Sequence, residues 1–226
     1  TPGKSMWLAG YGGRDKPSEG TLHDLRAKAL ALEDASGNKA VLVTSDILGF
    51  PKGMSDRIRD RLEERYGLSR ARVILNSSHT HSGPVLLDAL YDIYPLNSSE
   101  LGKVEEYSKE LEDKVVSLVG AALGKMEPAK IWSNNGVVRF QVNRRNNNEA
   151  LIDRQTSLNG PNDYAVPVIK VEKPDGRLLA VAFGYACHPT VLSFYKWSGD
   201  YPGFAQLELE KSHPGTMAMF FQGAGA

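Results

Sequence analysis

The sequence lacks a second cysteine, a long apolar run and an excess of charge of either sign. Because Cys187 is the one cysteine, an intrachain disulfide framework is excluded. No apolar run approaches the roughly 18 residues needed to span a bilayer, so no transmembrane segment is predicted. Lys and Arg together number 27, as do Asp and Glu. This balance argues against a nucleic-acid-binding protein, which usually carries a basic patch or stripe.

What is present is the composition of an ordinary globular protein, with 41% hydrophobic and 24% charged residues. Apolar runs of strand length alternate with helical patterns, which predicts a mixed α/β fold. We expect a β-sheet core of buried strands flanked by helices, with an active site at the strand ends. Because no linker divides the chain, residues 1–226 are expected to form a single domain.

Apolar periodicity and turn residues place the elements. Helices are expected to begin at Pro51, at Ser98 or Ser99 as the cap, and at Tyr201, with Asp200 as the cap. Strands are expected at residues 39–44, 72–75, 129–133, 137–142, 166–171, 178–187 and 216–221. The Asn-rich stretch from Asn143 to Asp163 is predicted to be a long surface loop, and such loops are often functional.

Two of the five histidines, His79 and His81, lie two residues apart directly after a predicted strand. In an extended strand, residues i and i+2 face the same side, so both imidazoles can point to one place. His188 ends a second apolar strand and is followed by Pro189. Imidazole nitrogens are zinc ligands, so two strand ends that deliver three histidines indicate a metal site. The alternative is that these histidines are only packed and hydrogen-bonded.

Other catalytic patterns are weaker. The chain has no G-x-S-x-G motif, and the glycine-rich stretch 9–13 lacks the spacing of a nucleotide-binding loop. Cys187 and His188 are neighbours on a predicted strand and point to opposite faces, so Cys187 is interpreted as a small buried apolar residue. His23 and His213 are expected at the surface.

Several segments resemble neutral/alkaline non-lysosomal ceramidases and occur in that family's order. They are residues 9–12, 79–84, 143–144, 185–190, 198–205 and 221–223. The resemblance implies a zinc-dependent hydrolase that cleaves an amide between a fatty acyl chain and an amino alcohol, as in ceramide-like lipids. The implied partner is thus a small-molecule or lipid N-acyl substrate.

The resemblance also implies a role for each site residue. His79 and His188 are the implied zinc ligands, and His81 would handle protons or substrate. Arg144, with Arg145 next in line, would stabilise a developing oxyanion. The expected substrate-binding residues are Tyr91, Arg145 and Asp200. A lipid substrate would also predict an apolar groove near the metal, formed in part by Leu86, Leu87, Leu90, Tyr91 and Tyr94; the alternative is that these side chains are only packed.

The family's remaining zinc ligands, a glutamate and a tyrosine, would follow the last residue of this chain, as would its serine-bearing loop. The chain is therefore expected to be the N-terminal half of a longer catalytic domain, trimmed at both ends and inactive by itself. By resemblance alone, the source is expected to be bacterial and the location secreted or periplasmic. Two alternatives stay open: a hydrolase of another bond, such as an ester or a sugar amide, and a non-catalytic binding or structural domain.

Overall fold

The computed structural model describes residues 1–225, with the exception of the side chain of Tyr91. Its helices are α1 (Lys52–Tyr66), α2 (Ser98–Leu123) and α3 (Asp200–Ser212), with short 3-10 helices η1 (Arg70–Arg72), η2 (Tyr91–Ile93) and η3 (Glu149–Arg154). Its strands are β1 (Gly20–Thr21), β2 (Ala27–Glu33), β3 (Lys39–Ser45), β4 (Val73–Ser77), β5 (Lys130–Val137), β6 (Ala165–Glu172), β7 (Leu178–Tyr185), β8 (Lys196–Trp197) and β9 (Met217–Gln222). The mixed α/β fold predicted from the sequence is confirmed.

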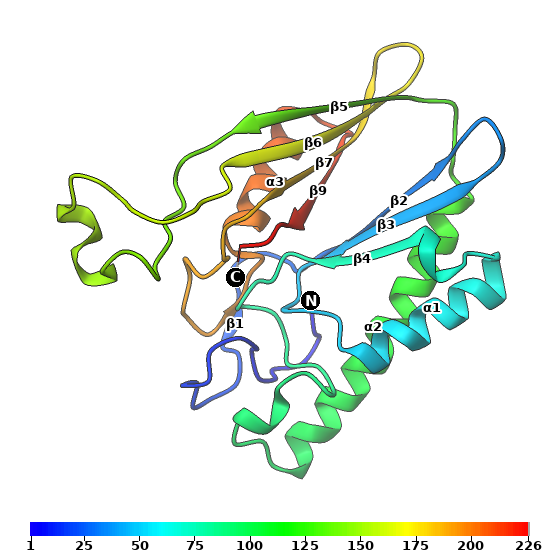
Figure 1. Ribbon diagram of the computed structural model, residues 1–226. Coiled ribbons are helices and arrows are strands. Elements are labelled where there is room, and N and C mark those ends of the chain that lie inside the picture. The colour runs from blue at the N-terminus through cyan, green and yellow to red at the C-terminus, as the bar shows by residue number, and fades with distance from the viewer. Residues whose placement is uncertain (226) are drawn as a thin grey trace.

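Two sheets face each other and share an apolar layer (Figure 1). One sheet has the order β2-β3-β4 and the other the order β5-β6-β7-β9, while β1 pairs with β8. Helices α1 and α2 cover the outer side of the first sheet, and α3 packs against β9. Within the described chain, no helix is long and apolar enough to cross a bilayer.

The carboxyl ends of four strands meet at one edge of the molecule. β3 is parallel to β4, and β7 is parallel to β9. The Asn76 side chain joins the two sheets there, because its Oδ1 accepts from the Gln222 backbone N at 2.9 Å and its Nδ2 donates to the Gln222 carbonyl at 3.4 Å. The loops that follow β4 and β7 therefore begin close together.

The core confirms the predicted periodicity of α1. Met54, Ile58 and Leu62 recur every four residues and are at most 1% exposed. They pack with α2 and with Val41 and Val43 of β3. Between the two sheets lies a second apolar cluster, formed by Leu30, Val171, Ala180, Ala182 and Met219.

Three local predictions are corrected. Asn97 caps α2, since its side chain accepts from the backbone N of Glu100 at 3.0 Å. Helix α3 begins at Asp200 and is preceded by Gly199. The two strands expected at residues 129–133 and 137–142 are replaced by β5, which continues through residues 134–136 because it is paired with β6 along its whole length.

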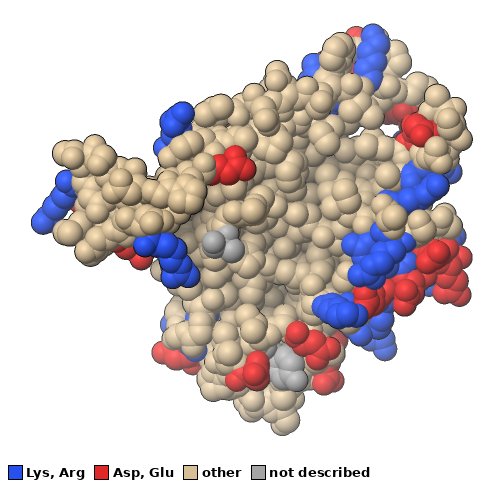
Figure 2. Space-filling view, viewed as in Figure 1, with Lys and Arg blue, Asp and Glu red and all other residues tan. Residues whose placement is uncertain are grey.

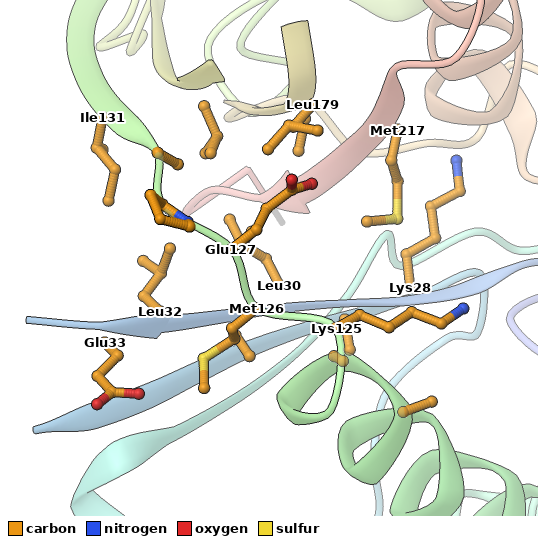
Figure 3. Close-up of a pocket in the computed structure, with 18 of the residues that line it drawn as sticks. Lys28, Leu30, Leu32, Glu33, Lys125, Met126, Glu127, Ile131, Leu179 and Met217 are labelled. Atoms are coloured by element: carbon orange, nitrogen blue, oxygen red, sulfur yellow. The ribbon is translucent and has the colours of Figure 1, made fainter. Parts of the chain in front are cut away.

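The sheets diverge towards β2 and β5 and leave a groove of about 800 Å³. Figure 3 shows apolar side chains entering it from β2, from the segment after α2, from β7 and from β9. The described histidines do not line this groove. On the face shown in Figure 2, charged side chains gather over the helical side and at the rim, whereas the middle is almost free of charge.

Candidate metal centre

Three histidines converge at the edge where the strands end. His79 and His81 lie in the loop after β4, and His188 lies in the loop after β7. One ligand nitrogen from each lies within 4.8 Å of the others. The ring centroids are 5.3 Å apart for His79 and His81, and 4.7 Å apart for each of these rings and His188. The structure thus brings together the three histidines that the sequence singled out, and they could hold a metal ion.

The path by which His79 and His81 meet differs from the expected extended strand. β4 ends at Ser77, and His79 has φ +61°, in the left-handed region that residues other than glycine rarely adopt. The two rings therefore meet through a turn and not through the alternation of a strand. Non-glycine residues in this region cluster at functional sites, where the surrounding structure holds them.

A backbone carbonyl orients His79. Its Nδ1 lies 2.6 Å from the carbonyl oxygen of Leu48. Because a carbonyl only accepts, Nδ1 carries the proton in the neutral ring, and this assignment leaves the Nε2 lone pair free. Histidines that bind metals are commonly held in this way, by a hydrogen bond from the other ring nitrogen.

His81 and His188 are held as neutral imidazoles. Their Nε2 atoms lie 2.8 Å apart, a distance at which one donates to the other. Burial lowers the pKa of His81 to about 3, followed by electrostatic repulsion of its protonated form by His188, His79, Arg14 and Arg144. Burial, followed by His79 and Arg144, also lowers the pKa of His188. Both rings are therefore neutral at pH 7, which is the form that binds a metal.

The packing around His81 fixes the orientation of its ring. Its Nδ1 is buried and has no hydrogen-bond partner among the described residues. Gly10 lies against the ring, where an added Cβ would clash with Cγ, and its φ of +102° also requires glycine. The ring is thus confined, and its Nε2 is held towards His188.

The polar loop between β5 and β6 carries the two arginines, both exposed, and extends away from the sheets (Figure 1). Arg144 lies close enough to lower the pKa of both His81 and His188. The backbone N of Arg145 donates to the side chain of Asn143. Asn147 ties the loop together, with Nδ2 donating to the carbonyls of Asn143 and Asn159. Of the two loop arginines, Arg144 is therefore the one whose charge reaches the histidines.

The other predicted substrate contacts are placed differently. Asp200 has no exposed surface, and backbone N–H groups occupy its carboxylate, so it faces the protein interior. The side chain of Tyr91 lies outside the described part of the structure. Leu86 and Tyr94 are buried in the core at 2% and 5% exposure, so they do not line an open lipid groove.

Two residues near the site were missed or misplaced by sequence reasoning. Arg14 is only 5% exposed, and its Nη1 donates to the carbonyls of Ala9 and His81, the latter at 2.7 Å. His23, expected at the surface, is half-buried, and its Nε2 accepts from the backbone N of Gly199 at 2.8 Å. His213 is exposed, as expected. No local pattern distinguishes a buried arginine or histidine from a solvated one, because burial depends on tertiary contacts.

The sequence model described as "Neutral/alkaline non-lysosomal ceramidase, N-terminal" matches residues 2–223. The chain belongs to this family. Neutral ceramidase B of Dictyostelium discoideum is 26% identical over 222 residues, which cover 92% of this chain and 30% of that protein. The neutral ceramidase of Pseudomonas aeruginosa is 24% identical over 213 residues, which cover 90% of this chain and 31% of that protein.

The fold is shared with a solved structure. The crystal structure of the neutral ceramidase from Pseudomonas aeruginosa superposes with a TM-score of 0.79 at 22% identity, over 96% of this chain and 35% of that one. This ceramidase-family chain thus spans about a third of the length of the relatives that it matches.

Proposed function

We propose that this chain is the metal-binding, N-terminal part of a zinc-dependent hydrolase that cleaves the amide bond of an N-acyl lipid of the ceramide type. The observation that supports the proposal most is the convergence of three imidazoles at one edge of a ceramidase-family fold. The relatives named above are called neutral ceramidases, which supports a ceramide-like substrate.

His79 and His188 would hold the ion. Nε2 of His79 is available because Nδ1 is engaged by Leu48. Nε2 of His188 already points at the other rings, since it lies 2.8 Å from Nε2 of His81. When bound, a zinc ion lowers the pKa of a water molecule and polarises an amide carbonyl.

His81 and Arg144 would act on the substrate beside the ion. With a pKa of about 3, His81 enters the reaction uncharged and is too weak a base to retain a proton, so its ring would pass a proton on and not store it. Arg144 is exposed on a long loop, so its guanidinium can approach a substrate and stabilise an oxyanion as negative charge develops. Histidine and arginine thus supply proton transfer and charge stabilisation from two different loops.

We further propose that the chain is the N-terminal part of a longer catalytic domain. The matching model is that of an N-terminal region, and the relatives are about three times as long as their matched part. The glutamate, tyrosine and serine-bearing loop of the family would then come from the rest of the protein. Activity is accordingly to be measured on the full-length protein.

Substrate profiling of the full-length protein tests the proposal. A fluorogenic N-acyl sphingosine would be compared with an ester and an N-acyl amino sugar of the same acyl chain. We expect amide cleavage of the lipid that a chelator abolishes and zinc restores. His188→Ala should lower kcat/KM by about a hundredfold or more, because the ion contributes several kcal/mol of charge stabilisation.

His213→Ala is the matched control, since His213 is exposed and lies outside the histidine group. It should leave kcat/KM unchanged. If the ester or the sugar amide is cleaved in preference, the proposed substrate is wrong but the proposed metal site still stands. Activity that is indifferent to both the chelator and His188→Ala would contradict the proposed function.

A further inference from the structure

The loop that carries His188 has no regular secondary structure between β7 and β8, yet it must place one imidazole opposite the two that follow β4. We refer to residues 187–192 as the His188 loop. Because the backbone of this loop is not paired in a sheet or helix, its course depends on the other groups that hydrogen-bond to its N–H and C=O groups. In the His188 loop, Asp200 and Tyr201 of the first turn of α3 supply three of these partners, and the Tyr11 hydroxyl donates to the carbonyls of Thr190 at 3.3 Å and Leu192 at 3.1 Å.

Asp200 holds the distal end of the His188 loop. Its Oδ2 accepts from the backbone N of Leu192 at 2.8 Å, and its Oδ1 lies 3.4 Å from the backbone N of Val191. The same Oδ1 accepts from the backbone N of Tyr201 at 2.6 Å. The carboxylate therefore links two consecutive residues of the loop to the start of the helix.

The conformation of Asp200 indicates that this link is maintained at a cost. Asp200 has no exposed surface, and no ion pair with it occurs in the described part of the chain. Its φ is +54°, which is uncommon for a residue with a side chain. Burying a carboxylate and holding it at a positive φ both cost free energy. Residues with such strained backbones cluster at functional sites.

Tyr201 holds the proximal end of the loop. Its hydroxyl donates to the carbonyl of Cys187 at 2.8 Å, and Nε2 of Gln222 donates to the same carbonyl at 3.1 Å. The tyrosine ring packs against Phe220, with the centroids 5.8 Å apart. His188 thus lies between two anchor points that adjacent residues of α3 provide.

We propose that Asp200 and Tyr201 are positioning residues that fix the His188 loop, so that the His188 imidazole faces His79 and His81. The inference rests on the proposed metal site and deepens it. It replaces the expected substrate-binding role of Asp200, whose carboxylate has no exposed surface. Partners that orient a ligand residue typically change metal affinity by about 10- to 100-fold when they are mutated.

The test is cobalt(II) binding to the full-length protein, stripped of metal, and to three variants. Asp200→Asn keeps the shape and removes the charge. Asp200→Gly removes the carboxylate and tolerates the positive φ. Tyr201→Phe keeps the ring and removes the hydroxyl hydrogen bond. Dissociation constants come from competition with a chelating dye, ligand geometry from the visible absorption of the bound ion, and folding from circular dichroism.

Asp88→Asn is the matched control, because Asp88 also has a positive φ, of 63°, but is exposed. We expect both Asp200 variants to bind cobalt about 10- to 100-fold more weakly, with an altered spectrum, and Tyr201→Phe to show a smaller loss. Asp88→Asn should match the parent.

The possible failures are distinguishable. If the parent binds cobalt and the folded variants keep its affinity and spectrum, the positioning role is wrong and the metal site stands. If the parent binds no cobalt, the proposed metal site is wrong and the positioning role is lost with it. Tyr201→Phe keeps the test decisive if the Asp200 variants do not fold, because it acts on the same loop through a different hydrogen bond.

Discussion

At the scale of single residues, the candidate site depends on groups that hold the histidines as much as on the histidines themselves. Leu48 orients His79 through its carbonyl, Arg14 holds the backbone of His81, and Asp200 and Tyr201 flank His188. The sequence predicted the three imidazoles because they stand near strand ends. It did not predict which groups hold them, since Leu48 and Arg14 lie 31 and 67 residues away along the chain and Asp200 was expected to contact the substrate.

Asp46 provides a test of how a buried charge affects this fold. Its side chain is 4% exposed, and Oδ2 accepts from the backbone N of Arg26 at 3.0 Å. Burial raises the pKa of its carboxyl, and the hydrogen bond from Arg26 opposes this effect only in part. The folded protein therefore holds the proton more tightly than the unfolded chain, in which an aspartate has a pKa of about 3.9.

We predict that Asp46→Asn stabilises the protein more, relative to the parent, as the pH rises. Between the unfolded and folded pKa values, the free energy of unfolding of the parent falls with rising pH, because the folded state binds more protons. The asparagine side chain does not titrate, so it makes no pH-dependent contribution, and its carbonyl oxygen can still accept the hydrogen bond from Arg26. The difference in unfolding free energy, variant minus parent, should grow by about 1 kcal/mol or more between about pH 3.5 and about pH 7.

Urea unfolding at several pH values measures this difference. Asp60→Asn is the control, since Asp60 is exposed on α1 and its substitution should give a difference that changes little with pH. A difference for Asp46→Asn that stays constant, or shrinks as the pH rises, would show that the carboxylate is not destabilised by burial.

At the scale of elements, prediction succeeded where local signals agreed with tertiary contacts. The spacing of Met54, Ile58 and Leu62 predicted α1, and Gly67 ends it in the left-handed conformation, with φ 65°. The turn at residues 173–176 joins β6 and β7 as a hairpin. Prediction failed at β5, because pairing with β6 keeps residues 134–136 in the strand, and sequence alone does not show that pairing.

Glycine-to-alanine substitutions just after α1 and within α2 should have opposite effects on stability. Gly67→Ala should lower the free energy of unfolding by about 1–2 kcal/mol, because the left-handed conformation is unfavourable for a residue with a Cβ. Gly102→Ala should raise it by about 0.5–1 kcal/mol, because Gly102 is exposed within α2 and an added Cβ meets no atom. Urea midpoints measure both, and a shift in the same direction would refute the assigned conformations.

At the scale of the whole molecule, the site exists because two separate sheets meet at one edge. The link between Asn76 and Gln222 brings the end of β4 next to the end of β9, which pairs with β7. The sequence indicated strands with histidines after them, but not which strand ends would be neighbours. That information lies in the packing of the two sheets, to which residues distant in the sequence contribute.

We propose that the loops after β4 and β7, one from each sheet, bind one metal ion together. X-ray absorption at the zinc edge tests it most directly, on the zinc-loaded full-length protein and on its His188→Ala and His213→Ala variants. We expect imidazole nitrogens at about 2.0–2.1 Å from the zinc, with outer-shell imidazole scattering that His188→Ala reduces and His213→Ala does not. A shell of oxygen atoms without imidazole scattering, or the same spectrum for all three proteins, would contradict it.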